Sequence, residues 1–152
     1  ELAQNCFRRP GEDEFRPGWE EIGAALEVAV TPEEYAALQR AKAFREERIP
    51  KFLGWFEQVL RRNPAGHLHL VGNSLTYADL SLFQLVAGLR YAFPKTTAGV
   101  LADTPLVAGL HGNVSRRERV HAYLQSPRRI AFNEEGIFRH YPELDGESFG
   151  SS

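Results

Sequence analysis

The stretch from Leu70 to Leu80, which reads LVGNSLTYADL, constrains the fold of this chain more than any other part of the sequence. Thr76 and Asp79 stand three residues apart, the spacing of a capping box in which each side chain accepts a hydrogen bond from the other residue's backbone N–H. We therefore interpret Thr76 and Asp79 as a structural N-cap and not as a catalytic pair. Leu75 and Leu80 are placed to form a hydrophobic staple across this cap.

The residues after the cap are apolar on nearly every side of the helix that it starts. Only a thin polar stripe interrupts them, and the apolar positions are Leu82, Phe83, Leu85, Val86, Ala87, Leu89 and Ala92. A helix that is apolar all round belongs in the interior of a protein. The sequence thus predicts a central buried helix around which other helices pack.

Further start signals occur along the chain. Thr31-Pro-Glu-Glu34 and Ser115-Arg-Arg-Glu118 have the spacing of capping boxes, and Thr104-Pro105 is a partial cap with Pro at the first helical position. Pro50 should interrupt or kink the helix that begins at Thr31, and an amphipathic run from Ile49 then reaches the breakers at Asn63-Pro-Ala-Gly66. These signals, together with the absence of paired strand patterns, predict an all-α helical bundle.

The expected organisation has three parts. Residues 1–30 are poorly assigned, residues 31–126 form the helical bundle, and residues 127–152 form an extended C-terminal tail whose last residues, 146–152, are expected to be disordered. The alternating segment His67–Val71 has no second strand to pair with, so we interpret it as a loop.

Composition excludes several classes of function. The net charge of −2 gives no global reason to expect nucleic acid as a partner, and no apolar run approaches the about 20 residues that a membrane span needs. The single cysteine, Cys6, and the absence of a signal peptide favour the cytoplasm. Because the sequence contains no methionine, we expect it to be part of a longer gene product.

Each remaining polar candidate has a plain structural explanation. His67 and His69 lie two apart in a Gly-rich loop without a neighbouring Cys or carboxylate, so we expect them to face solvent and claim no metal site. His121, His140 and Cys6 belong to no recognisable nucleophile motif. The arginines are more consistent with a solvated helix face than with a phosphate site; they are Arg116, Arg117, Arg119, Arg128 and Arg129.

The order of these motifs resembles the C-terminal helical domain of cytosolic glutathione transferases. The resemblance covers roughly residues 41–145 and rests on LVGNSLTYADL, the buried helix, the segment from Pro105 to Leu110 and VHAYLQS at 120–126. The tail from Arg128 to Asp145 is similar to a bacterial and fungal subgroup related to the sigma-type enzymes.

The resemblance implies a division of labour. In this family a thioredoxin-like N-terminal domain binds the co-substrate glutathione, and the helical domain lines the pocket for a small hydrophobic electrophile. The helical half carries no catalytic residue in this interpretation, and Tyr91, Phe93, Phe138 and Tyr141 are the candidates for substrate binding.

The resemblance also implies a possible homodimer and a role in detoxification. The sequence shows no β-α-β pattern, so we expect the glutathione site outside this chain and no transferase activity from the chain alone. A non-catalytic interaction or scaffold domain is the alternative.

Overall fold

The computed structural model describes residues 31–145. The expectations for residues 1–30 and 146–152 lie outside this range. The chain divides into two compact units, residues 1–41 and 42–152, and each is considered by itself. Within the described residues the structure contains helices and no strand, which confirms the predicted all-α class.

The first described helix, α3 (Pro32–Ala43), starts as predicted. The backbone N–H of Thr31 donates to Oε2 of Glu34 at 2.8 Å, and the N–H of Glu34 donates to Oγ1 of Thr31 at 3.3 Å. These two bonds complete a capping box. Hydrogen bonding of the carboxylate to Thr31 also lowers the pKa of Glu34.

A π-helical turn, η1 (Phe44–Arg48), precedes α4 (Ile49–Arg62). In this wider turn the N–H of Ile49 bonds to the carbonyl of Phe44, five residues earlier. Pro50 has no N–H and cannot continue an ordinary α-helical ladder, so the turn before it absorbs the mismatch. The predicted interruption at Pro50 takes this form, and helix resumes at once.

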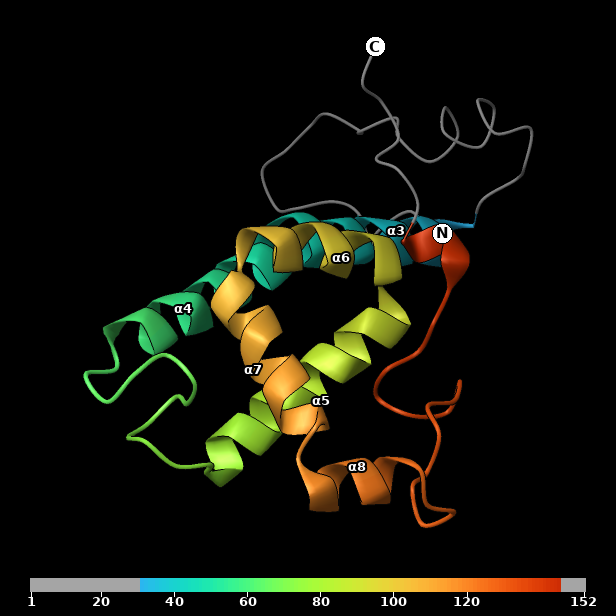
Figure 1. The fold of residues 1–152 in the computed structure, drawn as a ribbon. Helices are drawn as coiled ribbons and strands as arrows, with labels where there is room; N and C mark the ends of the chain where they lie inside the picture. Colours follow the sequence, from blue (N-terminus) through green and yellow to red (C-terminus); the bar gives the residue numbers. More distant parts are fainter. Residues whose placement is uncertain (1–30, 146–152) are drawn as a thin grey trace. The chain divides into compact units, whose positions relative to one another are not determined.

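The second unit is built around α5 (Tyr77–Ala92), which packs against both α6 (Pro94–Asp103) and α7 (Pro105–Ser115). Figure 1 shows α5 crossing the unit diagonally, with α7 beside it and α4 next to α6. The short helix α8 (Glu118–Leu124) and a 3₁₀ turn, η2 (Pro142–Leu144), complete the described elements. No helix in the described range is both long and apolar enough to cross a bilayer.

The core joins apolar side chains of α4, α5 and α7. Its fully or nearly fully buried members include Leu53, Leu60, Leu82, Val86, Leu89, Val107, Leu110 and Val114. The α5 side chains among them confirm the central buried helix. Of the two residues of the expected staple, Leu75 packs against the core, whereas Leu80 is 40 % exposed. Apart from Asp79, the buried residues of α5 lie in the turns after the first.

One start signal did not act as the sequence suggested, and one helix was not predicted. Ser115 ends α7, and its hydroxyl donates to the carbonyl of Gly112 at 2.8 Å, while α8 begins at Glu118 after an extended Arg117. The expected capping box at Ser115 is therefore wrong. Helix α6 was not predicted, because its start at Pro94 depends on a residue far away in the sequence.

Candidate functional site

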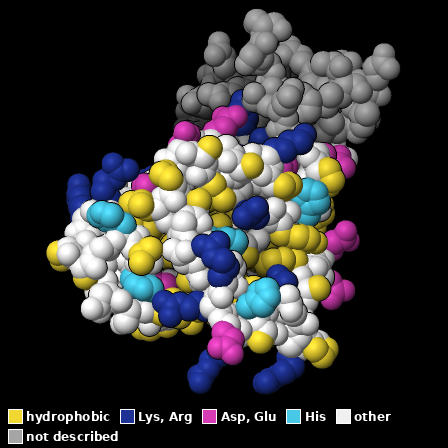
Figure 2. Space-filling model, viewed as in Figure 1, with side chains coloured by type: hydrophobic (Ala, Val, Ile, Leu, Met, Phe, Trp, Pro, Cys, Tyr) yellow, Lys and Arg dark blue, Asp and Glu magenta, His cyan; other side chains and the backbone are white. Residues whose placement is uncertain are grey.

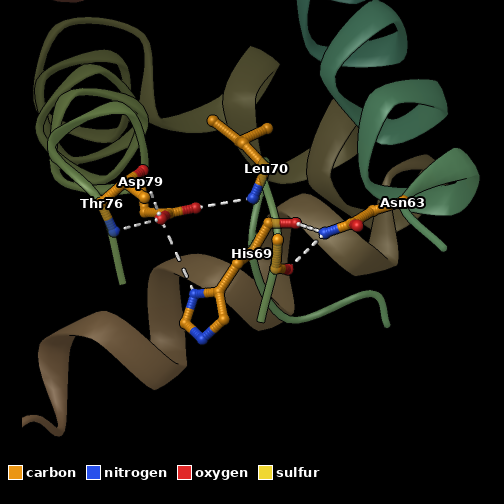
Figure 3. A network of polar contacts seen from close by, with 6 residues as sticks. Asn63, His69, Leu70, Thr76 and Asp79 are labelled. Atoms are coloured by element: carbon orange, nitrogen blue, oxygen red, sulfur yellow. Dashed lines mark hydrogen bonds and ion pairs between the residues drawn. The ribbon is translucent and has the colours of Figure 1, made fainter. Parts of the chain in front are cut away.

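The carboxylate of Asp79 joins the first turn of α5 to the loop before it (Figure 3). Its Oδ2 accepts the backbone N–H of Thr76 at 2.7 Å and the Thr76 hydroxyl at 2.9 Å, and its Oδ1 accepts the N–H of Leu70 at 2.7 Å. The capping box predicted at Thr76 and Asp79 is formed, and Asp79 is completely buried. All these partners are backbone or cap groups, so the pair has a structural task.

The loop is held from its other side by Asn63, at the end of α4. Its side-chain amide donates to the carbonyls of His69 and Gly72, both at 2.8 Å, and its Oδ1 accepts the N–H of Ala65 at 3.1 Å. Gly72 adopts a φ of 63°, which a residue with a Cβ rarely takes. Asn63 and Asp79 thus fix the loop between α4 and α5 at both ends.

The expectation of solvent-facing histidines is wrong for His69. Its side chain is buried, with Nδ1 at 3.7 Å from Oδ2 of Asp79 (Figure 3). His67 is exposed as expected, and its Nδ1 lies 3.0 Å from the carbonyl of Leu60. Within the described residues no group of three potential ligands is placed to hold a metal ion.

Two further helix starts share one device, a proline followed by a carboxylate from a distant part of the chain. At α7, Oε2 of Glu57 accepts the N–H groups of Leu106 and Val107 at 2.9 and 3.1 Å. At α6, the carboxylate of Asp145 accepts the N–H of Lys95 at 2.8 Å and that of Thr96 at 3.2 Å.

This device satisfies all the donors of the first turn after the cap, because the proline at the first helical position has no N–H and the carboxylate accepts the next two. Glu57 and Asp145 are both nearly fully buried. Thr104 occupies the predicted N-cap position of α7, but its hydroxyl donates to the carbonyl of Val100 at 2.8 Å and leaves the capping to Glu57.

Of the four candidate substrate-binding residues, the structure brings two into one aromatic cluster. The ring of Tyr91 stacks on Phe132 with centroids 5.0 Å apart, and Phe138 meets Phe132 edge-on at 6.0 Å. Phe93 instead pairs with Phe44 at 5.6 Å, and Tyr141 is partly exposed and belongs to neither group. The four candidates therefore do not form one continuous pocket within the described residues.

The cluster exists because the C-terminal segment folds back onto α5. A Cβ built on Gly88 would overlap the ring of Phe138, so the absence of a side chain at Gly88 makes room for this ring. Nδ1 of His140 lies 3.2 Å from the carbonyl of Ala92. Sequence reasoning missed Phe132, and it considered His140 only as a candidate member of a nucleophile motif. The turn signal at Asn133, whose Oδ1 accepts two backbone N–H groups, was the available indication that this segment reverses.

One titratable side chain of α7 has a displaced pKa. Burial, and secondarily the positive charge of Arg90, lower the pKa of His111 below its usual value of 6.5. The imidazole lies nearly parallel to the ring of Phe83, with centroids 4.9 Å apart. A neutral ring therefore fits this position better than a charged one.

The surface carries no single basic patch on the face seen in Figure 2, where Lys and Arg side chains are interspersed with acidic, histidine and hydrophobic ones. Two aromatic side chains of α4 stand out by exposure, Phe52 at 47 % and Trp55 at 58 %. The guanidinium of Arg48 lies 5.8 Å from the ring centre of Phe52. This group, Arg48, Phe52 and Trp55, is called the α4 aromatic face below.

Comparison with known proteins places these features in context. A family model described as "Glutathione S-transferase, C-terminal domain" matches residues 24–127. The chain is 28 % identical over 98 residues to "Glutathione S-transferase" of Plasmodium falciparum, covering 62 % of this chain and 44 % of the relative. It is 28 % identical over 128 residues to "Glutathione S-transferase A2" of Bos taurus, covering 82 % of this chain and 54 % of that protein.

A third relative is "Glutathione S-transferase P" of Homo sapiens, with 28 % identity over 96 residues that cover 63 % of this chain and 44 % of the relative. The chain thus spans about half of the length of the relatives that it matches.

Proposed function

Because the chain belongs to the glutathione S-transferase C-terminal domain family, we propose that it is the electrophile-side half of a glutathione transferase. Joined to a thioredoxin-like half, it conjugates or reduces small hydrophobic compounds with glutathione. The observation that carries this proposal is that a match to this one domain family extends over residues 24–127 while the chain covers about half of the relatives' length. The remaining half of such a protein is where the proposal puts the glutathione site.

The chemistry assigned to the two halves differs. The reacting group is the thiolate of glutathione, and a hydrogen bond that lowers the thiol pKa belongs to the thioredoxin-like half. The helical half supplies an apolar surface that binds the electrophile and excludes water. In this proposal Tyr91, Phe93, Phe138 and Tyr141 contribute to that surface. The buried carboxylates Glu57, Asp79 and Asp145 accept backbone N–H groups of this chain, so none of them is assigned to the reaction.

A direct test compares this chain with the longer product of its gene. Both are assayed with glutathione and an aryl halide such as chlorodinitrobenzene, and glutathione binding is measured by calorimetry. We expect turnover and binding only in the longer product. Micromolar binding of glutathione by residues 1–152 alone would contradict the placement of the thiol site in the other half.

The assignment of the aromatic residues has its own test. In the active longer product, Phe138→Ala should raise KM for the aryl halide and leave KM for glutathione unchanged. Tyr123→Ala is the matched control, because Tyr123 is an exposed aromatic residue of α8. Equal effects of both changes on KM would remove Phe138 from the electrophile surface.

The proposed enzyme is a cytoplasmic homodimer that acts in detoxification, in the sigma-related subgroup. The α4 aromatic face supports a dimer, since exposed Trp, Phe and Arg side chains are enriched at protein interfaces. Sedimentation equilibrium should show that Trp55→Glu dissociates the dimer, whereas Tyr77→Glu, at a more exposed aromatic residue of α5, does not.

The alternative function is a non-catalytic interaction or scaffold domain of the same family. The α4 aromatic face also fits this alternative, because it would then bind a different protein. A gene product without a thioredoxin-like segment upstream of Glu1, or one that remains a monomer and inactive with glutathione, would favour the scaffold.

A further inference from the structure

A hollow of about 450 Å³ opens between the C-terminal end of α4 and the loop that leads to α5. The hollow is shallow and open to solvent, and its volume lies within the about 300–1,000 Å³ range of sites for small molecules. Apolar side chains provide most of its lining, namely those of Val59, Pro64, Ala65, Leu70 and Val71. The hollow shares no lining residue with the aromatic cluster of Tyr91, Phe132 and Phe138 or with the α4 aromatic face.

The walls of the hollow are held in place before any ligand arrives. The N–H of Leu70 donates to buried Asp79, and Asn63 ties the loop to α4 through the carbonyls of His69 and Gly72. A preformed wall lowers the entropic cost of binding, because no loop has to be ordered at that moment.

The charged side chain that lines the hollow is positive. Among the described residues that line it, Arg62 is the only one with a charged side chain. Both N–H groups of the Asn63 amide are already used within the loop, so this amide has no donor left for a ligand. The neighbouring Arg61 does not line the hollow, and its guanidinium lies 3.5 Å from the Glu57 carboxylate. Recognition of a polar group therefore depends on Arg62.

We propose that this hollow binds a free medium-chain alkyl carboxylate, with the alkyl chain against Val59, Leu70 and Val71 and the carboxylate on the Arg62 guanidinium. An apolar lining calls for an apolar ligand body, and the planar guanidinium matches the two oxygens of a carboxylate. The site is separate from the proposed transferase function and does not depend on it.

The test uses residues 1–152 and sodium decanoate below its micellar concentration, with decanol as the uncharged probe. Two-dimensional ¹H–¹⁵N spectra should show decanoate shifting the amides of residues 59–72. Arg62→Gln should weaken decanoate binding about fivefold, the upper range for an exposed ion pair, and leave decanol binding unchanged. Arg61→Gln is the matched control and should retain decanoate binding.

A charge reversal separates recognition from mere folding. Arg62 is exposed, so Arg62→Glu should fold normally and prefer decylammonium over decanoate. Equal binding of decanoate and decanol by the unaltered chain would overturn the proposal. So would shifts confined to Phe52 and Trp55, the absence of binding at millimolar decanoate, or a continued preference for decanoate in the charge-reversed variant.

Discussion

Glu57 gives the sharpest test of how this fold is held together. Its side chain is only 3 % exposed, and Oε2 alone accepts the N–H groups of Leu106 and Val107 at the start of α7. Glu57→Gln keeps the shape of the side chain and one acceptor oxygen but removes the negative charge. Hydrogen bonds to charged groups contribute about 1.5–3 kcal/mol, against about 0.5–1.5 for neutral ones, so each bond loses about 1 kcal/mol.

Two such bonds give an expected loss of about 2 kcal/mol in the free energy of unfolding. For a chain of this length, 152 residues, that loss corresponds to a decrease in Tm of about 4–8 °C. Glu57→Ala removes the acceptor altogether and should cost about 3–5 kcal/mol, since two buried N–H groups lose their partner and a cavity is left.

Thermal and urea unfolding followed by circular dichroism at 222 nm measure these losses, and hydrogen exchange of the Leu106 and Val107 amides shows where they arise. Glu47→Gln serves as the control, because Glu47 is exposed and should change stability by less than about 0.5 kcal/mol. If Glu57→Gln were as stable as this control variant, the charge of Glu57 would not be supporting α7.

Three further outcomes are expected. Asp79→Ala should lower the free energy of unfolding by about 0.5–2 kcal/mol or more, the cost of an ordinary N-cap loss. Urea unfolding measures this change, and an unchanged midpoint would mean that the cap does not stabilise the fold. Gly88→Ala should displace the ring of Phe138, which a Cβ at this position would overlap, and a fluorine label on Phe138 would report the displacement; an unaltered fluorine spectrum would contradict the packing. Burial and Arg90 lower the pKa of His111 in the folded chain, so the unfolded chain takes up the proton first as the pH falls. The contribution of His111 to the free energy of unfolding is therefore constant above its usual pKa of 6.5. Below that pH the stability decreases until the lowered pKa is reached. His111→Gln should reduce this decrease in unfolding curves measured from pH 5 to 8.

Local sequence signals predicted the helix starts whose partners lie within one turn. The boxes at Thr31 and Thr76 each join residues three apart. The cap of α6 could not be predicted in this way, because Asp145 lies 50 residues after Lys95. Ser115 shows the converse limit, since its hydroxyl can bond backward to the helix that it ends as readily as forward to a new one.

The surroundings of side chains were harder to predict than the helices. His69 resembles a solvated loop residue in the sequence, yet the bonds of Asn63 to its carbonyl and of Asp79 to the next N–H draw the backbone inward at this point. Tyr91 and Phe138 were named as candidates, but the ring between them, Phe132, lies in a segment without helical periodicity. Only the tertiary fold brings these rings together.

The separation between Asp145 and the start of α6 has a consequence for the growing polypeptide on the ribosome. At about 5–20 residues per second, the 50 residues between Lys95 and Asp145 take about 2.5–10 seconds to be translated. During that interval the first turn of α6 lacks its acceptor, so the nascent chain cannot close this helix start in its final form. Until Asp145 has been synthesised, the start of α6 therefore cannot reach its final hydrogen-bonded form.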